Sequence, residues 1–105
     1  MYRATTPTHT FKLPAQASSY KEIQITYRQG SVVLVKHYQD GTLPSGMTFD
    51  GNKVLIRLTQ EETMCFLPKE KAWVQVRVLT NDDDAYASKR FRIVVNKVLN
   101  EEVLA

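Results

Sequence analysis

The chain has 105 residues, of which 43% are hydrophobic and 24% are charged. That length suits one domain with one hydrophobic core and leaves no room for a second, so we expect a single domain over residues 1–105, with residues 98–105 as a C-terminal tail. The formal net charge of +3 is mild, and the lysines and arginines are spread along the chain. Because a dedicated nucleic-acid-binding protein gathers its basic residues on one element, this distribution argues against nucleic acid as the partner.

The only cysteine in the sequence, Cys65, can form no internal disulfide. This favours a reducing compartment. Residues 1–9 are polar and lack the apolar core of a secretory signal, and no apolar run approaches the roughly 20 residues that a membrane-spanning helix needs. We therefore expect the protein to have no contact with a membrane.

Short segments in which apolar and polar residues alternate run through the chain and predict β-strands. The first segment is residues 11–13. The second, residues 22–28, is the clearest, because Ile23, Ile25 and Tyr27 fall on one face of a strand and would scatter around a helix. These three side chains are therefore expected to point into the core.

The third segment, residues 32–35, is apolar on both sides, which predicts a strand that is covered on both faces. Residues 29–30, Gln-Gly, predict a tight hairpin between the second and third segments. Turn residues at 40–41 end the third strand, and another set at 50–52 precedes the fourth segment, residues 53–58.

A short helix is predicted directly after the fourth strand. Thr59 and Glu62 have the spacing of a capping box, in which each side chain bonds to the backbone N–H of the other residue. Apolar residues follow and Pro68 ends the turn, so we expect this helix to plug one end of the fold. Two further alternating segments, residues 74–78 and 90–96, complete the pattern.

Together these segments predict an all-β fold, a single antiparallel two-sheet sandwich of the immunoglobulin-like type with about six to seven strands and one short helical turn. Antiparallel pairing is favoured because short links join sequential strands. A small β-barrel is the main structural alternative.

The residues that most often carry chemistry do not form a recognisable catalytic or metal-binding pattern. His9 and His37 lack a second ligand at metal spacing, and we expect each to be a partly covered structural residue at an inward-facing strand end. Cys65 has no neighbouring base to lower its thiol pKa, so we expect it to be a small buried hydrophobic residue. Helix capping and loop solubility explain the acidic runs at 61–62 and 82–84. The chain is therefore not expected to be an enzyme, or to bind a cofactor, a metal or a small-molecule substrate.

Outward positions near and along the last two long strands hold the candidate interaction residues, namely Trp73, Arg77, Leu79, Arg90 and Arg92. If those strands pair, Arg77 would lie near Arg90 or Arg92 in a positive patch that could contact phosphates or acidic side chains. Leu55 and Arg57 have the same outward parity on an earlier strand and would extend this surface. The alternative is an ordinary solvated sheet face.

Trp73 has the parity opposite to Val74 and Val76, so it is predicted to face outward, where tryptophan often marks an interface. The alternative is that Trp73 packs under the helical turn or the N-terminal arm. Residues 98–105 carry apolar pairs on both sides of an acidic centre. A tail of this kind either folds back on its own domain or docks on a neighbour.

Four segments resemble parts of small uncharacterised proteins encoded by prophages of Gram-positive bacteria. They are residues 6–11, 21–27, 58–63 and 76–80. More distantly, the layout is similar to the N-terminal β-sandwich of phage baseplate upper proteins. The likeness spans residues 6–98, with two departures: the turn at residues 81–85 lacks an expected glycine, and a baseplate protein continues into host-contacting modules.

This resemblance implies a phage or prophage structural or accessory protein, of the tail or baseplate, that acts through protein–protein interaction. Its partners would be other phage structural proteins or further copies of itself. It would be found in the bacterial cytoplasm during assembly, or in the virion. The alternative, from the residues alone, is a non-enzymatic β-sandwich module that binds a polyanion or a carbohydrate through Trp73 and the arginines.

Overall fold

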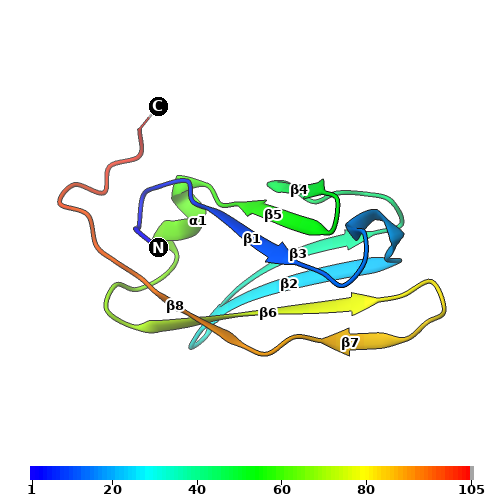
Figure 1. Ribbon diagram of the computed structural model, residues 1–105. Helices are drawn as coiled ribbons and strands as arrows, with labels where there is room; N and C mark the ends of the chain where they lie inside the picture. The colour runs from blue at the N-terminus through cyan, green and yellow to red at the C-terminus, as the bar shows by residue number, and fades with distance from the viewer. Residues whose placement is uncertain (105) are drawn as a thin grey trace.

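The larger sheet is built around a β-hairpin. Strands β2 (Glu22–Gln29) and β3 (Val32–Gln39) pair antiparallel, and the turn between them places Gly30 in the left-handed region at a φ of 56°. This confirms the hairpin predicted from residues 29–30. Strand β6 (Lys71–Leu79) pairs with the other edge of β2, so β2 lies in the middle of three long strands (Figure 1).

Two short strands continue this sheet beyond β6. Strand β7 (Ala85–Ala87) pairs with one end of β6, and strand β8 (Phe91–Val94) pairs with the other end, both antiparallel. The strand predicted over residues 90–96 is therefore shorter than expected, and a separate short strand precedes it. The larger sheet has five strands in total.

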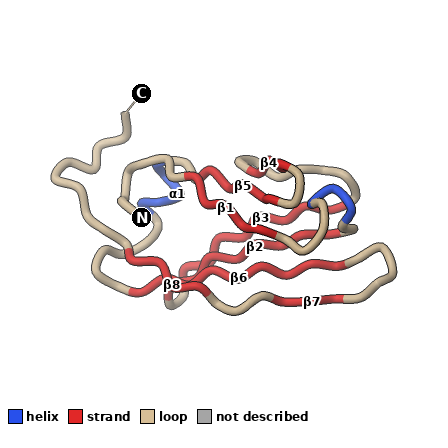
Figure 2. The backbone as a smooth tube through the Cα atoms, viewed as in Figure 1, coloured by secondary structure: helices blue, strands red, loops and turns tan. Residues whose placement is uncertain are grey.

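The smaller sheet has three strands in the order β1-β5-β4. They are β1 (Thr8–Lys12), β4 (Met47–Asp50) and β5 (Lys53–Arg57), all antiparallel. This sheet lies over the larger one, and the two short helices, η1 (Ala17–Ser19) and α1 (Gln60–Met64), lie at opposite ends of the sandwich (Figures 1 and 2).

The computed structural model describes residues 1–104, so residue 105 of the predicted tail lies outside the described residues. The all-β class and the antiparallel two-sheet sandwich are confirmed, with eight strands instead of about six to seven. The additional strands are β4 and β7, which are only four and three residues long and lie among turn residues. Among residues 1–104, no helix has the length and apolar character needed to cross a membrane.

The core lies between the two sheets. Ile23, Ile25 and Tyr27 on β2 are fully buried, as predicted, and so are Val54 and Ile56 on β5. Because burying such a side chain stabilises the fold by about 1.5–3 kcal/mol, this layer is a main source of stability. The other buried hydrophobic residues are Leu13, Ala17, Tyr20, Tyr38, Met47, Leu58, Phe66, Ala72, Val74, Val76 and Val95.

Strand β3 corrects the prediction of a strand covered on both faces. It is an edge strand, because it pairs with β2 on one side only. Its even-numbered residues point toward the smaller sheet, whereas Val33 and Val35 lie on the outer face and are 52% and 44% exposed. A run of apolar residues indicates that both faces of a strand are apolar. It does not indicate whether another layer of the structure covers each face.

The capping box at the start of α1 is confirmed, and it is tied to β3 by an ion pair. The Glu62 N–H donates to Thr59 Oγ1 at 3.1 Å, and the Thr59 N–H donates to Glu62 Oε1 at 2.9 Å. The other oxygen of Glu62 accepts a 2.6 Å hydrogen bond from the buried Lys36 on β3. Burial alone would raise the pKa of Glu62, but the hydrogen bonds from Lys36 and Thr59 hold this pKa below its ordinary value.

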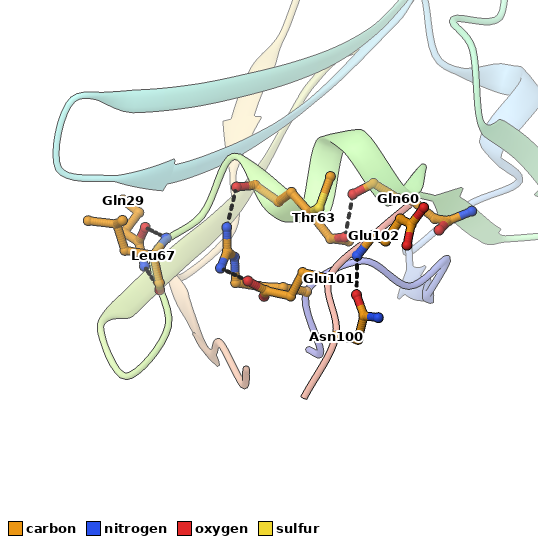
Figure 3. Close-up of polar contacts among 9 residues, drawn as sticks. Gln29, Gln60, Thr63, Leu67, Asn100, Glu101 and Glu102 are labelled. Atoms are coloured by element: carbon orange, nitrogen blue, oxygen red, sulfur yellow. Dashed lines mark hydrogen bonds and ion pairs between the residues drawn. The ribbon is translucent and has the colours of Figure 1, made fainter. Parts of the chain in front are cut away.

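Two hydrogen bonds between Gln29 and Leu67 also hold the end of the sandwich around α1 (Figure 3). The buried amide of Gln29 pairs with the backbone of Leu67, since Gln29 Nε2 donates to the Leu67 carbonyl at 2.9 Å and the Leu67 N–H donates to Gln29 Oε1 at 2.6 Å. Phe66 is fully buried beside them, which agrees with a helix that closes one end, although Leu67 itself is exposed.

The described part of the tail runs past α1 and the N-terminal segment (Figures 1 and 3). Arg3 donates to Glu101 at 2.6 Å and to the Met64 carbonyl at 3.1 Å. The Gln60 side-chain amide makes two hydrogen bonds to the backbone of Leu104, at 2.9 and 2.8 Å. The tail therefore contacts its own domain through Glu101 and Leu104.

Replacing Gly46 by alanine should destabilise the fold more than the same change at Gly51. Both glycines have positive φ, but a Cβ at Gly46 would overlap the backbone carbonyl of Arg57, whereas a Cβ at Gly51 would meet open space. We expect Gly51→Ala to cost about 1–2 kcal/mol from the left-handed backbone. We expect Gly46→Ala to cost about 1–3 kcal/mol more from overpacking. Urea unfolding measures both, and equal losses would contradict the close approach.

The Glu62 ion pair should make stability depend on pH in acid. Because the folded-state pKa of Glu62 lies below its ordinary value of 4.5, its contribution is fully present above pH 4.5 and is lost as the pH falls through the folded-state pKa. Glu62→Gln should therefore flatten the decline of the free energy of unfolding below pH 4.5, measured by denaturant titration at stepped pH. Glu61→Gln is the matched control on the same turn, and an unchanged slope in Glu62→Gln would refute this account.

Candidate interaction surfaces

The sandwich is open along one side, because the two sheets differ in width. The smaller sheet ends at β1, while the larger sheet continues past β6 to β7 and β8 (Figure 1). A groove of about 730 Å³ lies between β1 and β7. Its lining is mostly apolar, and the apolar side chains that form it include Phe11, Leu13, Tyr20, Val76, Val78, Tyr86 and Phe91.

Two aromatic residues of this groove face inward but are not covered. Tyr86 lies directly opposite Val78, and Phe91 lies opposite the buried Val74, so each shares the inward face of the larger sheet. Their exposed fractions are nevertheless 61% and 49%. No strand of the smaller sheet lies over them, which is the physical reason that Phe91 departs from the predicted inward burial.

The groove is bordered by two sheet edges whose backbone groups are free. On the β1 side, the Leu13 N–H donates to the Asn52 carbonyl and the Leu58 N–H donates to the Pro7 carbonyl. The odd-numbered residues of β1 therefore direct their backbone hydrogen bonds toward β5. Because antiparallel pairing alternates, the N–H and C=O groups of Thr8, Thr10 and Lys12 point away from β5, and in the same way those of Ala85 and Ala87 on β7 point away from β6.

Lys12 is the only charged residue among those that line the groove. It lies directly opposite Lys53 on β5, and both residues are exposed. Two like charges in directly opposite positions destabilise a sheet slightly. Within residues 1–104, Lys12 takes part in none of the ion pairs, so the outward side of β1 at the border of the groove carries a positive charge without a paired carboxylate.

A second candidate surface is the outer face of the larger sheet. Trp73 lies there as predicted, directly opposite Arg28 on β2 and Arg92 on β8. The guanidinium of Arg90 lies over the Trp73 ring, 5.1 Å from its centroid. The ring is therefore covered by an arginine and not by the helical turn or the N-terminal arm, which was the alternative.

The other predicted interaction residues lie elsewhere. Arg77 faces Ala87 and Leu79 faces Ala85, so both lie at the β7 end of the outer face, away from Arg92. The expectation that Arg77 would lie near Arg92 is wrong, because Ala87 of β7 takes the position opposite Arg77 and Arg92 lies opposite Trp73. Nearness of Arg77 to Arg90 stays a prediction.

Two further members of the predicted outward set belong to a different surface. Leu55 and Arg57 lie on β5, in the smaller sheet, and therefore cannot extend the surface around Trp73. Parity within a strand gives the face of that strand, but it does not give the sheet to which the strand belongs.

The side chains considered as catalytic or metal-binding candidates each take part in a separate structural contact. His9 is partly covered on the inward face of β1, as predicted, with its Nδ1 2.7 Å from the hydroxyl of Tyr27. Burial and the charge of the N-terminus lower the pKa of His9, and burial raises the pKa of Tyr27. Among residues 1–104, no group of three His, Cys, Asp or Glu side chains could hold a metal ion.

Two of these residues correct the sequence expectations. His37 does not face inward, because Lys36 and Tyr38 take the inward positions of β3, and its Nε2 lies 2.8 Å from Glu22 Oε1. Cys65 is exposed and not buried. The chain leaves α1 in such a way that the next residue, Phe66, takes the buried position.

Comparisons with known proteins show no family for this chain. No family model matches it, and no curated protein shows significant similarity to it. The resemblance to prophage proteins and to baseplate upper proteins therefore stays a prediction.

The groove itself was not predicted from the sequence. The alternation of Phe91 and Ile93 indicates which residue faces inward, but it gives no information on the width of the opposite sheet.

Proposed function

We propose that this protein is a non-enzymatic interaction module that holds a segment of another protein in the groove between β1 and β7. The observation that carries this proposal is the pair of inward-facing aromatic residues, Tyr86 and Phe91, that no strand covers. Exposed apolar surfaces of this kind mark interaction sites. Covering about 100 Å² of each ring would contribute about 2 kcal/mol per ring to binding.

The resemblance described above supplies the setting of this proposal. It makes the protein a structural or accessory part of a phage or prophage, of the tail or baseplate, whose partners are other phage structural proteins or further copies of itself. Such a part would be present in the bacterial cytoplasm during assembly, or in the virion. The support for this setting is the likeness of the four segments between residues 6 and 80, together with the sandwich fold.

The chemistry of the described residues supports a binding role over a catalytic one. His9 bonds to Tyr27, His37 pairs with Glu22, and the Cys65 thiol donates to a backbone carbonyl. A nucleophile and a base would have to lie within hydrogen-bond reach of each other, and these three groups come from separate elements, each with its own structural partner.

The proposal predicts that peptides selected from a random library of roughly ten-residue segments will bind in the groove. Tyr86→Ala should weaken their binding by about 30-fold, which corresponds to the loss of about 2 kcal/mol. Tyr2→Ala is the matched control, because Tyr2 is similarly exposed, at 57%, and is not part of the groove. Fluorescence polarisation measures the affinities. Selected peptides that ignore Tyr86→Ala would contradict the proposal.

The outer face supports a second candidate function, the binding of a polyanion or an acidic carbohydrate. Arg28 and Arg92 lie on either side of Trp73, and Arg90 lies over its ring, so three cations gather around one aromatic side chain. None of the residues directly opposite Trp73 on the neighbouring strands is acidic. An anionic polymer would neutralise this cluster and release its own counterions.

This second candidate predicts salt-dependent binding of heparin, followed by the fluorescence of Trp73. Replacing Arg92 by glutamine should weaken binding and lower the slope of log affinity against log salt by about one unit. Arg57→Gln removes the same charge from the other sheet and should leave the slope unchanged. If both substitutions lowered the slope equally, heparin binding would depend on the net charge of the protein and not on the arginines around Trp73.

A further inference from the structure

We infer that the groove accepts its partner as an added β-strand, paired with the free edge of β1, and that this strand carries an acidic side chain opposite Lys12. This inference rests on the proposed function, since it names the chemistry and the binding mode of the partner for the same groove. The partner is an extended segment of a different protein, with apolar and polar residues in alternation.

The free edge of β1 supplies the binding groups. Thr8, Thr10 and Lys12 each direct one N–H and one C=O away from β5, in a row along the side of the groove. Such an edge pairs readily with another extended chain. A small apolar molecule in the groove would leave these backbone groups without a partner, whereas a strand satisfies them.

β1 is a better acceptor than β7 because of what the new strand would cover. A strand added to β1 widens the smaller sheet, and its inward side chains then lie over the inward faces of β6 and β7. Those faces hold Val76, Val78 and Tyr86, which line the groove. A strand added to β7 would widen the larger sheet, which already extends beyond the smaller one. No opposite sheet would then cover the apolar side chains of the added strand.

The alternation of a strand sets the chemistry of the partner. The side chains of His9 and Phe11 point inward on β1, so that of Lys12 points outward. A residue opposite Lys12 on the added strand would also point outward, while its two neighbours would point into the groove. The pattern that fits is therefore an apolar residue, an acidic residue and another apolar residue.

Charge supports the acidic position. Lys12 has a lysine, Lys53, opposite it on β5, and Lys53 has Asp50 of β4 on its other side. Lys12 is therefore the lysine of this row without a directly opposite carboxylate, and no acidic residue lines the groove. An acidic side chain on the other side of Lys12 turns an unfavourable neighbourhood into a favourable one, because directly opposite unlike charges stabilise a sheet. A basic side chain at the same position would place a cation on both sides of Lys12, whereas Lys53 keeps Asp50 on its other side.

The protein's own tail is a poor match for this site. Glu101 is held by Arg3, and the backbone of Leu104 is held by Gln60, beside α1. Val98 and Leu99 are adjacent, as are Val103 and Leu104, so the tail lacks the alternation that the groove requires. A partner from outside this chain fits better than a second copy of the tail.

The test uses two synthetic seven-residue peptides of alternating valine and threonine, one with glutamate and one with lysine at a central polar position. We expect the wild-type protein to bind the glutamate peptide about five- to tenfold more tightly than the lysine peptide. Lys12→Glu should reverse this preference. Lys97→Glu, with the same change of charge outside the groove, should not reverse it.

The binding mode has its own measurement. In an added strand, the amide of Thr10 donates a hydrogen bond to the peptide, so its hydrogen exchange should slow on binding. Methylation of the peptide amides that face β1 should abolish binding, whereas methylation of those on the other edge should be tolerated. Isotope-edited NMR reports both results.

Each contrary outcome has a distinct meaning. Binding that depends on Tyr86 but neither protects the Thr10 amide nor distinguishes the two peptides would overturn strand addition and leave the proposed function standing. Concentration-dependent self-association that Tyr86→Ala abolishes would overturn the assignment of the groove to a different protein. Uptake of a small apolar dye such as ANS, with no peptide binding at all, would overturn both proposals.

Discussion

The burial of one face of β2 is the constraint on which the rest of the structure depends. Ile23, Ile25 and Tyr27 lie in the middle of three long strands and are fully buried, so the smaller sheet must lie over this centre. A sheet of three strands placed there cannot also cover β7 and β8. The open groove is therefore a consequence of how the core is formed, and the apolar residues in it remain exposed because the covering layer ends at β1.

The end of the sandwich near α1 is closed by polar contacts that are matched in pairs. Lys36 is a lysine on an inward position of an edge strand, which would be costly without a partner, and Glu62 supplies that partner while it also caps α1. Gln29 performs a similar role for the loop that follows. These contacts give Lys36 and Gln29 hydrogen-bond partners at the closed end of the fold, whereas backbone groups on the side between β1 and β7 remain free.

The two candidate surfaces lie on opposite faces of the same sheet. Strand β6 contributes Val76 and Val78 to the groove and Trp73 to the cationic outer face, because neighbouring residues of a strand point in opposite directions. One face is apolar and bordered by free backbone groups, and the other gathers arginines around an aromatic ring. The first suits an extended protein segment and the second suits an anion, so the two functions need not compete for the same residues.

The sequence by itself determined the local features of this protein, namely the inward residues of β2 and β5, the hairpin at Gly30 and the capping box of α1. Alternation, turn chemistry and side-chain spacing are local, and each acts within a few residues of the chain. Only the tertiary structure decided which strands share a sheet, and hence that Arg57 lies apart from Trp73, that Arg77 faces Ala87, and that Val35 is exposed. The groove belongs to this second group, because the width of one sheet relative to the other depends on strand pairings between residues far apart in the sequence.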